Sequence, residues 1–228
     1  MDIHKPKPFH SVKEFLSEIS VVVIGIVIAL GGEQLVEMFH WHEIVESERT
    51  VLHADIQDQV QIIVARSVQR DCVERRLAEL DTVLARHKGR QPLGLAGPVG
   101  RPQNSTSDDS LWRVAITSQA VSRMSAEERG DLSGSYSNFM NFFNLQREAD
   151  AAWMDVAVLD RADLLEEGDW VLLRKAVAKL HLMEDRIELV APYVIETVNA
   201  GFKAPKVTLE EALHSDYSKA LCRPLLAQ

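Results

Sequence analysis

The side chains best suited to chemistry gather in one short segment, His40–Glu43, which is followed by Glu46, Arg49 and His53. Imidazole and carboxylate groups are common ligands of divalent metals, so His42, Glu46 and His53 are candidate metal ligands. On an α-helix they would fall within about 60° of one another. His42 and His53 would nevertheless lie about three turns apart, too far for one ion, and Arg49 between them would repel it. We therefore interpret the segment as an exposed polar stripe and predict no metal site.

No other group of residues forms a recognisable catalytic pattern. The sequence lacks the motifs GxGxxG, GxxxxGK[ST], GxSxG and HExxH, and its serines, cysteines and lysines stand in no nucleophile context. Glu33 and Glu37 could be a proton or cation site at a membrane edge, although acids there more commonly mark the interface. His181 is spaced to hydrogen-bond Glu184 or Asp185 locally. The sequence predicts no cofactor and leaves enzymatic activity uncertain, with a non-enzymatic role favoured.

The composition argues against binding to nucleic acid. The 228 residues include 34 acidic and 25 basic ones, giving a formal net charge of −9. Recognition of a nucleic-acid backbone needs concentrated Lys and Arg, so no nucleic-acid partner is expected. One compact basic group follows the N-terminus, and because acids interleave with it we interpret it as a solvated helix face. Its members are Arg66, Arg70, Arg75 and Arg76.

The two cysteines, Cys72 and Cys222, show no CxxC or paired Cys/His spacing, which argues against structural zinc. They could form one disulfide in an oxidising compartment. They could equally be two small buried apolar residues. The sequence leaves both alternatives open.

The most informative stretch is the uncharged apolar run at residues 20–32. Extended back to Phe15, it has about 18 residues and would form about 27 Å of helix, close to the roughly 30 Å hydrocarbon core of a bilayer. Glu18 would then lie near a boundary, where charge is tolerated better than at the midplane. A capping pattern that begins at Ser11, together with aromatic residues near position 40, places the transmembrane helix and its interface at residues 11–40.

Two other interpretations compete with a transmembrane helix. A buried parallel strand fits the composition, but the run is long and no βαβ pattern follows it. A cleavable signal peptide would use the Ala29–Gly31 segment as its cleavage site. Against cleavage, Glu14 and Glu18 directly precede the run, and apolar residues continue beyond it. We predict an uncleaved anchor.

Charge asymmetry predicts the orientation of this anchor. Three lysines precede the apolar run, whereas no Lys or Arg follows it before Arg49. The positive-inside rule then places residues 1–10 in the cytoplasm and residues 41–228 outside it. The three lysines are Lys5, Lys7 and Lys13.

One face of the predicted membrane helix carries only small residues. Gly25, Ala29 and Gly32 fall at i, i+4 and i+7 and would share that face. Small residues let a second helix approach closely, and such packing replaces the hydrophobic drive that is absent in lipid. The face is therefore a candidate packing site, although glycine is also simply common in transmembrane helices.

The remaining residues show helical patterns. Residues 40–87 are expected to form one long helix that could continue the membrane helix, because no Pro or Gly interrupts residues 33–88. Residues 87–106 contain four Gly and three Pro and form the obvious loop. A loop of this length is usually functional or disordered.

Beyond the loop, helix-start signals and apolar periodicity alternate along the chain, whereas strand patterns are nearly absent. The signals lie at residues 108–110, 125–128, 168–169 and 208–211, with an aromatic stripe at 136–153 and a 3–4 apolar spacing at 173–198. The predicted fold is all-α, with a single N-terminal transmembrane helix leading into a long helix and an antiparallel helical bundle.

The stretch Glu14–Leu30, with its FLxEI and VVIGIxIAL segments, resembles the opening of a group of uncharacterised bacterial single-span membrane proteins. The similarity covers the N-terminal part of the chain and ends after Leu30. Beyond this point the chain has Gly31–Glu33 and His40–His42, where the proteins that it resembles tend to carry Asn, Trp and Arg. The similarity implies a bacterial envelope protein of unknown function and transfers no catalytic residue. With the orientation predicted from the lysines, we expect a protein of the bacterial inner membrane whose main domain is periplasmic.

These observations together favour a membrane-anchored helical interaction or accessory protein of the bacterial envelope. Its expected partners are the lipid bilayer and either a second copy of the chain or another membrane protein. The alternative is an extracytoplasmic ligand-binding or sensory domain. Residues 1–10 are too few for a cytoplasmic output module, which weakens that alternative.

Overall fold

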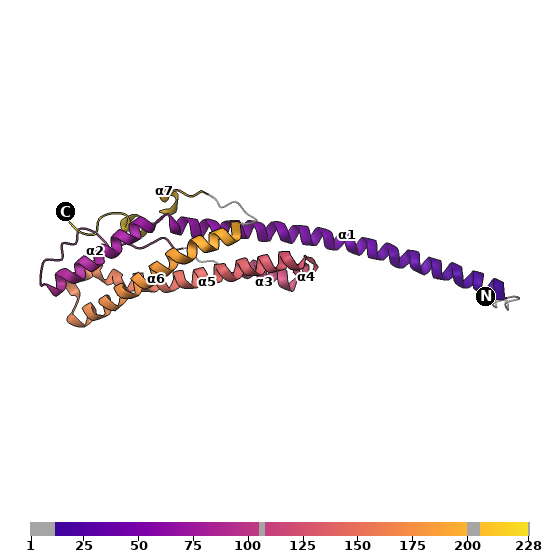
Figure 1. Cartoon of the computed structure of the whole chain (residues 1–228), viewed down its shortest axis with the longest axis horizontal. Coiled ribbons are helices and arrows are strands. Elements are labelled where there is room, and N and C mark those ends of the chain that lie inside the picture. The colour runs from indigo at the N-terminus through magenta and orange to yellow at the C-terminus, as the bar shows by residue number, and fades with distance from the viewer. Residues whose placement is uncertain (1–11, 105–107, 200–205, 228) are drawn as a thin grey trace, which may run out of the picture.

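The computed structural model describes residues 12–104, 108–199 and 206–227, and these residues form an all-helical molecule. The predicted fold class is confirmed: a long apolar N-terminal helix leads into helices that pack together (Figure 1). The elements in chain order are α1 (Val12–Ser67), α2 (Arg70–Lys88), α3 (Ser110–Thr117), α4 (Ala120–Arg123), α5 (Ala126–Val156), the 3-10 helix η1 (Ala157–Leu164), α6 (Glu167–Asn199), α7 (Leu209–Ala212) and α8 (Asp216–Leu221).

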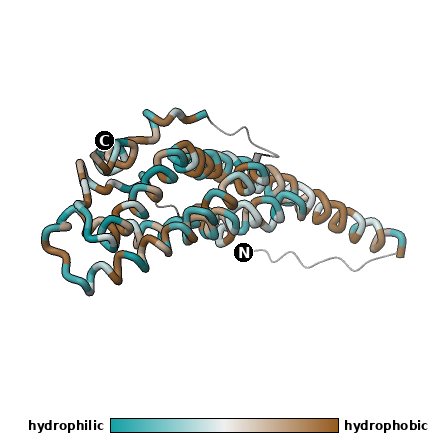
Figure 2. Tube along the Cα trace, turned by 60° about the vertical axis from the view of Figure 1, so that its left-hand side comes forward, coloured by the Kyte–Doolittle hydropathy of each residue, from teal (hydrophilic) through white to brown (hydrophobic). Residues whose placement is uncertain are grey.

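Helix α1 runs without interruption through 56 residues, so the apolar N-terminal segment and the first helix of the domain are one element. Its first buried side chain is Val45, and Arg123 of α4 contacts α1 at Trp41 and Glu37. The part of α1 before these contacts projects from the domain as a single helix (Figure 1). Figure 2 shows this projecting part as largely hydrophobic. The helix is long and apolar enough to cross a membrane, and its most apolar 18-residue window is not buried anywhere in the protein.

The expected single helix over residues 40–87 is instead divided at Val68–Gln69, where α1 ends and α2 begins. Neither Gly nor Pro causes the division. The buried Gln69 side chain bonds outside the helical ladder: its amide nitrogen donates to the Ala65 carbonyl and its oxygen accepts from the Gln103 backbone N–H at 2.8 Å. The division lets α2 turn its apolar stripe toward different neighbours from those of α1.

The domain therefore contains two apolar cores arranged along its length. The core nearer the projecting helix joins α1, α3, α4, α5 and the second half of α6. The far core joins α2, the end of α5, η1, the first half of α6 and the C-terminal tail. Apolar side chains of α1 and α2 divide between the cores: Leu52, Ile56 and Ile63 are buried in the first, and Leu77 and Leu80 in the second.

The Gly/Pro-rich segment predicted as a loop at residues 87–106 is irregular over its described part from Gly89 to Asn104, but it is packed against the C-terminal tail. The Ala96 N–H donates to the Leu225 carbonyl at 2.8 Å, and Val99 is fully buried. Gly100 has φ +64°, and a Cβ there would lie 2.4 Å from the Leu221 nitrogen, so a side chain would force the tail away. This part of the loop therefore has a structural role.

A disulfide joins Cys72 on α2 to Cys222 in the tail, with the two Cα atoms 4.8 Å apart. The structure thus resolves the two alternatives that the sequence left open. The disulfide closes a stretch of 150 residues and fixes the tail on α2.

Helix boundaries follow the predicted caps in part. Ser125 accepts from the Glu128 N–H, and Thr208 forms a full capping box, as the sequence predicts. The helix that begins at the signal of residues 108–110 ends at Thr117, because Gln119 adopts φ +64° and separates α3 from α4. Two short helices, α7 and α8, follow the signal at residues 208–211. The capping pattern at Ser11 lies outside the described residues.

Candidate functional site

The predicted polar stripe lies on α1 just beyond the projecting segment. His42 and Glu46 are exposed, and Glu46 is ion-paired with Arg49. His53 lies farther along and borders a groove. Within the described parts of the chain, no three His, Cys, Asp or Glu residues are grouped closely enough to hold a metal ion.

Arg49 cross-links α1 to the start of α5. Its Nε donates to Glu128 Oε1 at 2.6 Å and its Nη2 donates to Glu128 Oε2 at 2.8 Å, a bidentate pair. The hydrogen bonds from Arg49 hold the pKa of the Glu128 carboxyl below its usual value, and they raise the pKa of the Arg49 guanidinium. This pair fixes the α5 N-terminus onto α1, which the sequence did not predict because the two residues are far apart in the chain.

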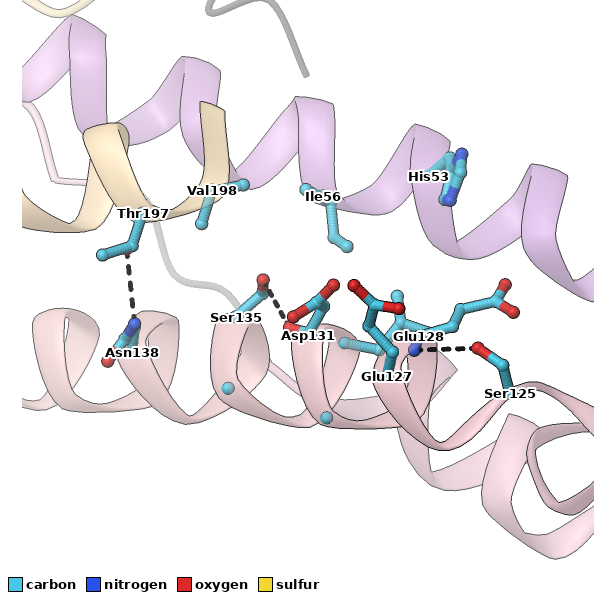
Figure 3. A pocket seen from close by; sticks show the side chains of 13 residues that line it. His53, Ile56, Ser125, Glu127, Glu128, Asp131, Ser135, Asn138, Thr197 and Val198 are labelled. Carbon is cyan, nitrogen blue, oxygen red and sulfur yellow. Dashed lines mark hydrogen bonds between the residues drawn. The ribbon is translucent and has the colours of Figure 1, made fainter. Parts of the chain in front are cut away.

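Beside this pair lies a groove of about 540 Å³ between α1, the N-terminal part of α5 and the C-terminal end of α6, which we call the α1–α5 groove (Figure 3). His53 and Ile56 form its α1 wall, and Thr197 and Val198 line it from α6. Its α5 wall is acidic and polar, comprising Ser125, Glu127, Glu128, Asp131, Ser135 and Asn138.

Several polar groups of the groove serve the fold. The Ser125 hydroxyl accepts from the Glu128 N–H at 3.1 Å, and the Ser135 hydroxyl donates to the Asp131 carbonyl at 2.8 Å (Figure 3). Asn138 Nδ2 donates to the Thr197 hydroxyl at 3.4 Å and so links α5 to α6. The groove thus offers an acidic, partly apolar surface suited to a cationic or hydrogen-bond-donating ligand rather than an arrangement of nucleophile and base.

A buried polar cluster marks the junction of the two cores. Arg66, at the end of α1, is ion-paired with Glu184 of α6, and both side chains are almost fully buried. The other carboxylate oxygen, Glu184 Oε1, accepts from Trp153 Nε1 of α5 at 2.7 Å. A cavity of about 260 Å³ adjoins Arg66 and Glu184. The sequence indicates for Glu184 only a spacing compatible with a local bond to His181. In the structure Glu184 instead bonds to Arg66 and Trp153, and His181 Nε2 lies 3.0 Å from Asp81 Oδ2 of α2.

The interpretation of the basic group as a solvated face is wrong for two of its members. Arg70 and Arg75 are exposed, but Arg66 and Arg76 are buried. Arg76 Nη2 donates to the carbonyls of Ala220, Leu221 and Arg223, at 2.9, 3.2 and 2.6 Å. Burial lowers the pKa of the Arg76 guanidinium. Buried arginine is rare unless it is paired, and here it binds the tail beside the disulfide.

The small-residue face predicted on the membrane helix lies in the projecting part of α1. A Cβ atom added at Gly25 or Gly32 would meet nothing within 4 Å, and Ala29 is exposed. The described residues of this chain therefore leave the face uncovered.

Comparison with models of protein families, with curated proteins and with solved structures gives no match.

Proposed function

We propose that the chain is a membrane-anchored helical interaction or accessory protein of the bacterial envelope. One observation carries the proposal: the uncharged stretch of α1 contains no buried residue, whereas the same helix buries one of its faces from Val45 onward. An exposed apolar helix of this length needs a nonpolar surrounding, and a bilayer supplies it over about 30 Å. The envelope assignment rests on the resemblance of Glu14–Leu30 to bacterial single-span proteins.

Two features support placing the helical domain outside the cytoplasm. The lysine bias before the span predicts a cytoplasmic N-terminus. The Cys72–Cys222 disulfide suits an oxidising compartment, since cytosolic thiols are kept reduced. The charge of the N-terminal lysines and the redox state of the cysteines are independent features of the chain.

Fusions at the C-terminus test this topology. An alkaline phosphatase fusion should be active and a green fluorescent protein fusion dark, because the phosphatase needs export to fold and the fluorescent protein fails to fold after export. The opposite pair of results would refute the extracytoplasmic placement.

The exposed face with Gly25, Ala29 and Gly32 is the proposed contact for a second copy of the chain or for a membrane protein partner. Close backbone approach at small residues stabilises helix pairs in lipid, so Gly25→Leu should disrupt the assembly. Val23→Leu, on the opposite side of the helix, is the matched control because both changes keep the span apolar. Cross-linking in mild detergent measures the outcome, and an unchanged assembly in Gly25→Leu would contradict this contact.

A second candidate function is an extracytoplasmic ligand-binding or sensory domain, which the volume and acidic wall of the α1–α5 groove favour. Purification in mild detergent followed by mass spectrometry separates the two candidates. A stoichiometric membrane protein supports the accessory role, whereas a retained cationic small molecule supports the ligand-binding role.

A further inference from the structure

The cavity of about 260 Å³ beside the buried Arg66–Glu184 pair has the construction of a small-ligand site. It is lined by α2, α6 and the last turn of α1, and we call it the α2–α6 cavity. Ligand sites are mostly apolar and carry a few converging polar groups. A cavity of about 150 Å³ holds benzene, so this one has room for a ring with a polar substituent. Its buried apolar walls are Val73 and Leu77 of α2 and Ile187 and Ala191 of α6.

Arg66 brings an unused hydrogen-bond donor to this cavity. Its Nη2 donates to Glu184 Oε2, and the guanidinium makes no other hydrogen bond within the described residues. Nε is enclosed without a partner, whereas Nη1, which also has none, is not enclosed. Because Arg66 is otherwise buried and borders the cavity, Nη1 is the donor that the cavity offers. Both oxygens of Glu184 are already used, by Arg66 and by Trp153. A bound molecule with an acceptor would therefore satisfy Arg66.

The charges around the cavity decide the charge of its ligand. Four carboxylate side chains border it, but only two guanidinium groups do. Both guanidinium groups are already ion-paired: Arg66 with Glu184, and Arg70 with Glu74 and with Glu188 of α6. An anion would meet an excess of negative charge, and a cation would lie beside a guanidinium to which it offers no acceptor. An uncharged molecule avoids both costs.

We propose that the α2–α6 cavity binds a small uncharged molecule with an apolar ring or chain and one carbonyl oxygen. The carbonyl accepts from Arg66 Nη1, and the apolar part lies against the four wall residues. The Arg70–Glu188 pair joins α2 to α6 at the exposed rim, where ion pairs open at little cost, so it permits entry. The cavity lies in the helical domain, apart from the projecting segment of α1, so this site is independent of the proposed membrane anchor.

Three probes of nearly one shape test the site. Acetophenone carries the carbonyl, α-methylstyrene has a CH₂ group in place of the carbonyl oxygen, and benzoate is the corresponding anion. The full chain in lipid nanodiscs is labelled with ¹⁵N-tryptophan, which gives four indole N–H signals. The Trp153 indole donates to Glu184, the partner of Arg66, so its NMR signal reports binding. The other three tryptophans do not border the cavity, and their signals reveal any effect of probe dissolved in the lipid.

Acetophenone should shift the Trp153 signal in a saturable way. α-Methylstyrene should bind at least about tenfold more weakly, the factor expected for loss of a hydrogen bond to a charged donor, and benzoate should give no saturable shift. Ala191→Leu fills the cavity and should abolish the shift, whereas Ala178→Leu on the exposed side of α6 should preserve it. In the double variant Arg66→Met/Glu184→Gln, acetophenone and α-methylstyrene should bind equally well. Val73→Phe replaces Ala191→Leu if the latter fails to fold.

Equal affinities of acetophenone and α-methylstyrene for the original protein would overturn the role of Arg66. Tighter binding of benzoate than of acetophenone would overturn the uncharged ligand. A shift that persists in the filled variant, or no saturable Trp153 shift with any probe, would refute the site itself. Each of these outcomes leaves the membrane anchor untouched, because no probe or variant involves the projecting part of α1.

Discussion

The buried pair at the junction of the two cores provides a direct test of the packing. Arg66 and Glu184 have side-chain exposures of 4% and 6%, so neither charge is well solvated. Trp153 Nε1 also depends on Glu184 for its acceptor. We expect Glu184→Gln to keep an acceptor for Trp153 while removing the negative charge, which isolates the effect of an unpaired buried guanidinium.

The magnitude follows from this geometry. Removing one partner of a buried pair typically costs 3–5 kcal/mol, and the adjoining cavity lets water approach Arg66, so we expect about 3 kcal/mol for Glu184→Gln. Arg66→Met should cost a similar amount, because it leaves a buried carboxylate. The double variant removes both charges and should lie within about 1 kcal/mol of the original protein. The two effects should therefore be strongly non-additive.

Urea unfolding of the full chain in mild detergent, followed by tryptophan fluorescence, gives the free energy of unfolding for each variant. Glu74→Gln is the matched control, because Glu74 pairs with Arg70 on the surface and should change stability by about 0.5 kcal/mol or less. Additive losses in the double variant would refute the reasoning. So would a Glu184→Gln effect no larger than that of the control.

Three further predictions concern other parts of the fold. The Cys72–Cys222 disulfide should leave no thiol open to alkylation without reductant, and its removal should lower the free energy of unfolding by up to about 5 kcal/mol, as expected for so long a closed loop. The pKa of the Glu128 carboxyl in the folded protein lies below its usual 4.5, so the Arg49–Glu128 pair should stabilise the fold above that pH. The difference in the free energy of unfolding between the original protein and Glu128→Gln should then shrink as the pH falls through the folded pKa. Arg76→Met should lower the free energy of unfolding by about 3 kcal/mol, because it leaves carbonyls of the tail without a donor. Hydrogen exchange of the tail amides should be faster in this variant even though the disulfide persists.

The sequence predicted the elements whose information is local. Apolar spacing correctly identified the buried stripe of α6, including Leu173, Leu180 and Ile187, because a helix repeats its faces every few residues. The capping signals at Ser125 and Thr208 were equally reliable, since a cap involves residues only three positions apart. The exposed position of Gly25, Ala29 and Gly32 agrees with a membrane helix, but their role as a contact stays a prediction.

Features that depend on distant residues could not be predicted. The division of the long helix at Gln69 coincides with a hydrogen bond that the Gln69 side chain accepts from Gln103, which lies 34 residues away in an irregular segment. The burial of Arg76 follows from carbonyls near residue 220, which no spacing rule connects with α2. The α1–α5 groove was missed for the same reason, because its walls come from three separate parts of the chain and only His53 had been considered as a site residue.

A charged residue inside an apolar spacing is nevertheless a usable signal when it occurs on two helices. Glu184 occupies a buried position of the α6 stripe, and Arg66 follows Ile63 by three residues on α1. Two such interruptions of opposite charge indicate a buried pair and hence which levels of two helices lie side by side.

The pair contributes little net stability, because desolvation offsets most of its attraction. Its position is informative for another reason: it lies where the two apolar cores meet, and an apolar seam alone would permit α1 and α6 to slide by one turn. The double variant should then be almost as stable as the original protein, but its α1 and α6 should align less uniquely. The fluorescence emission of Trp153 would report this change.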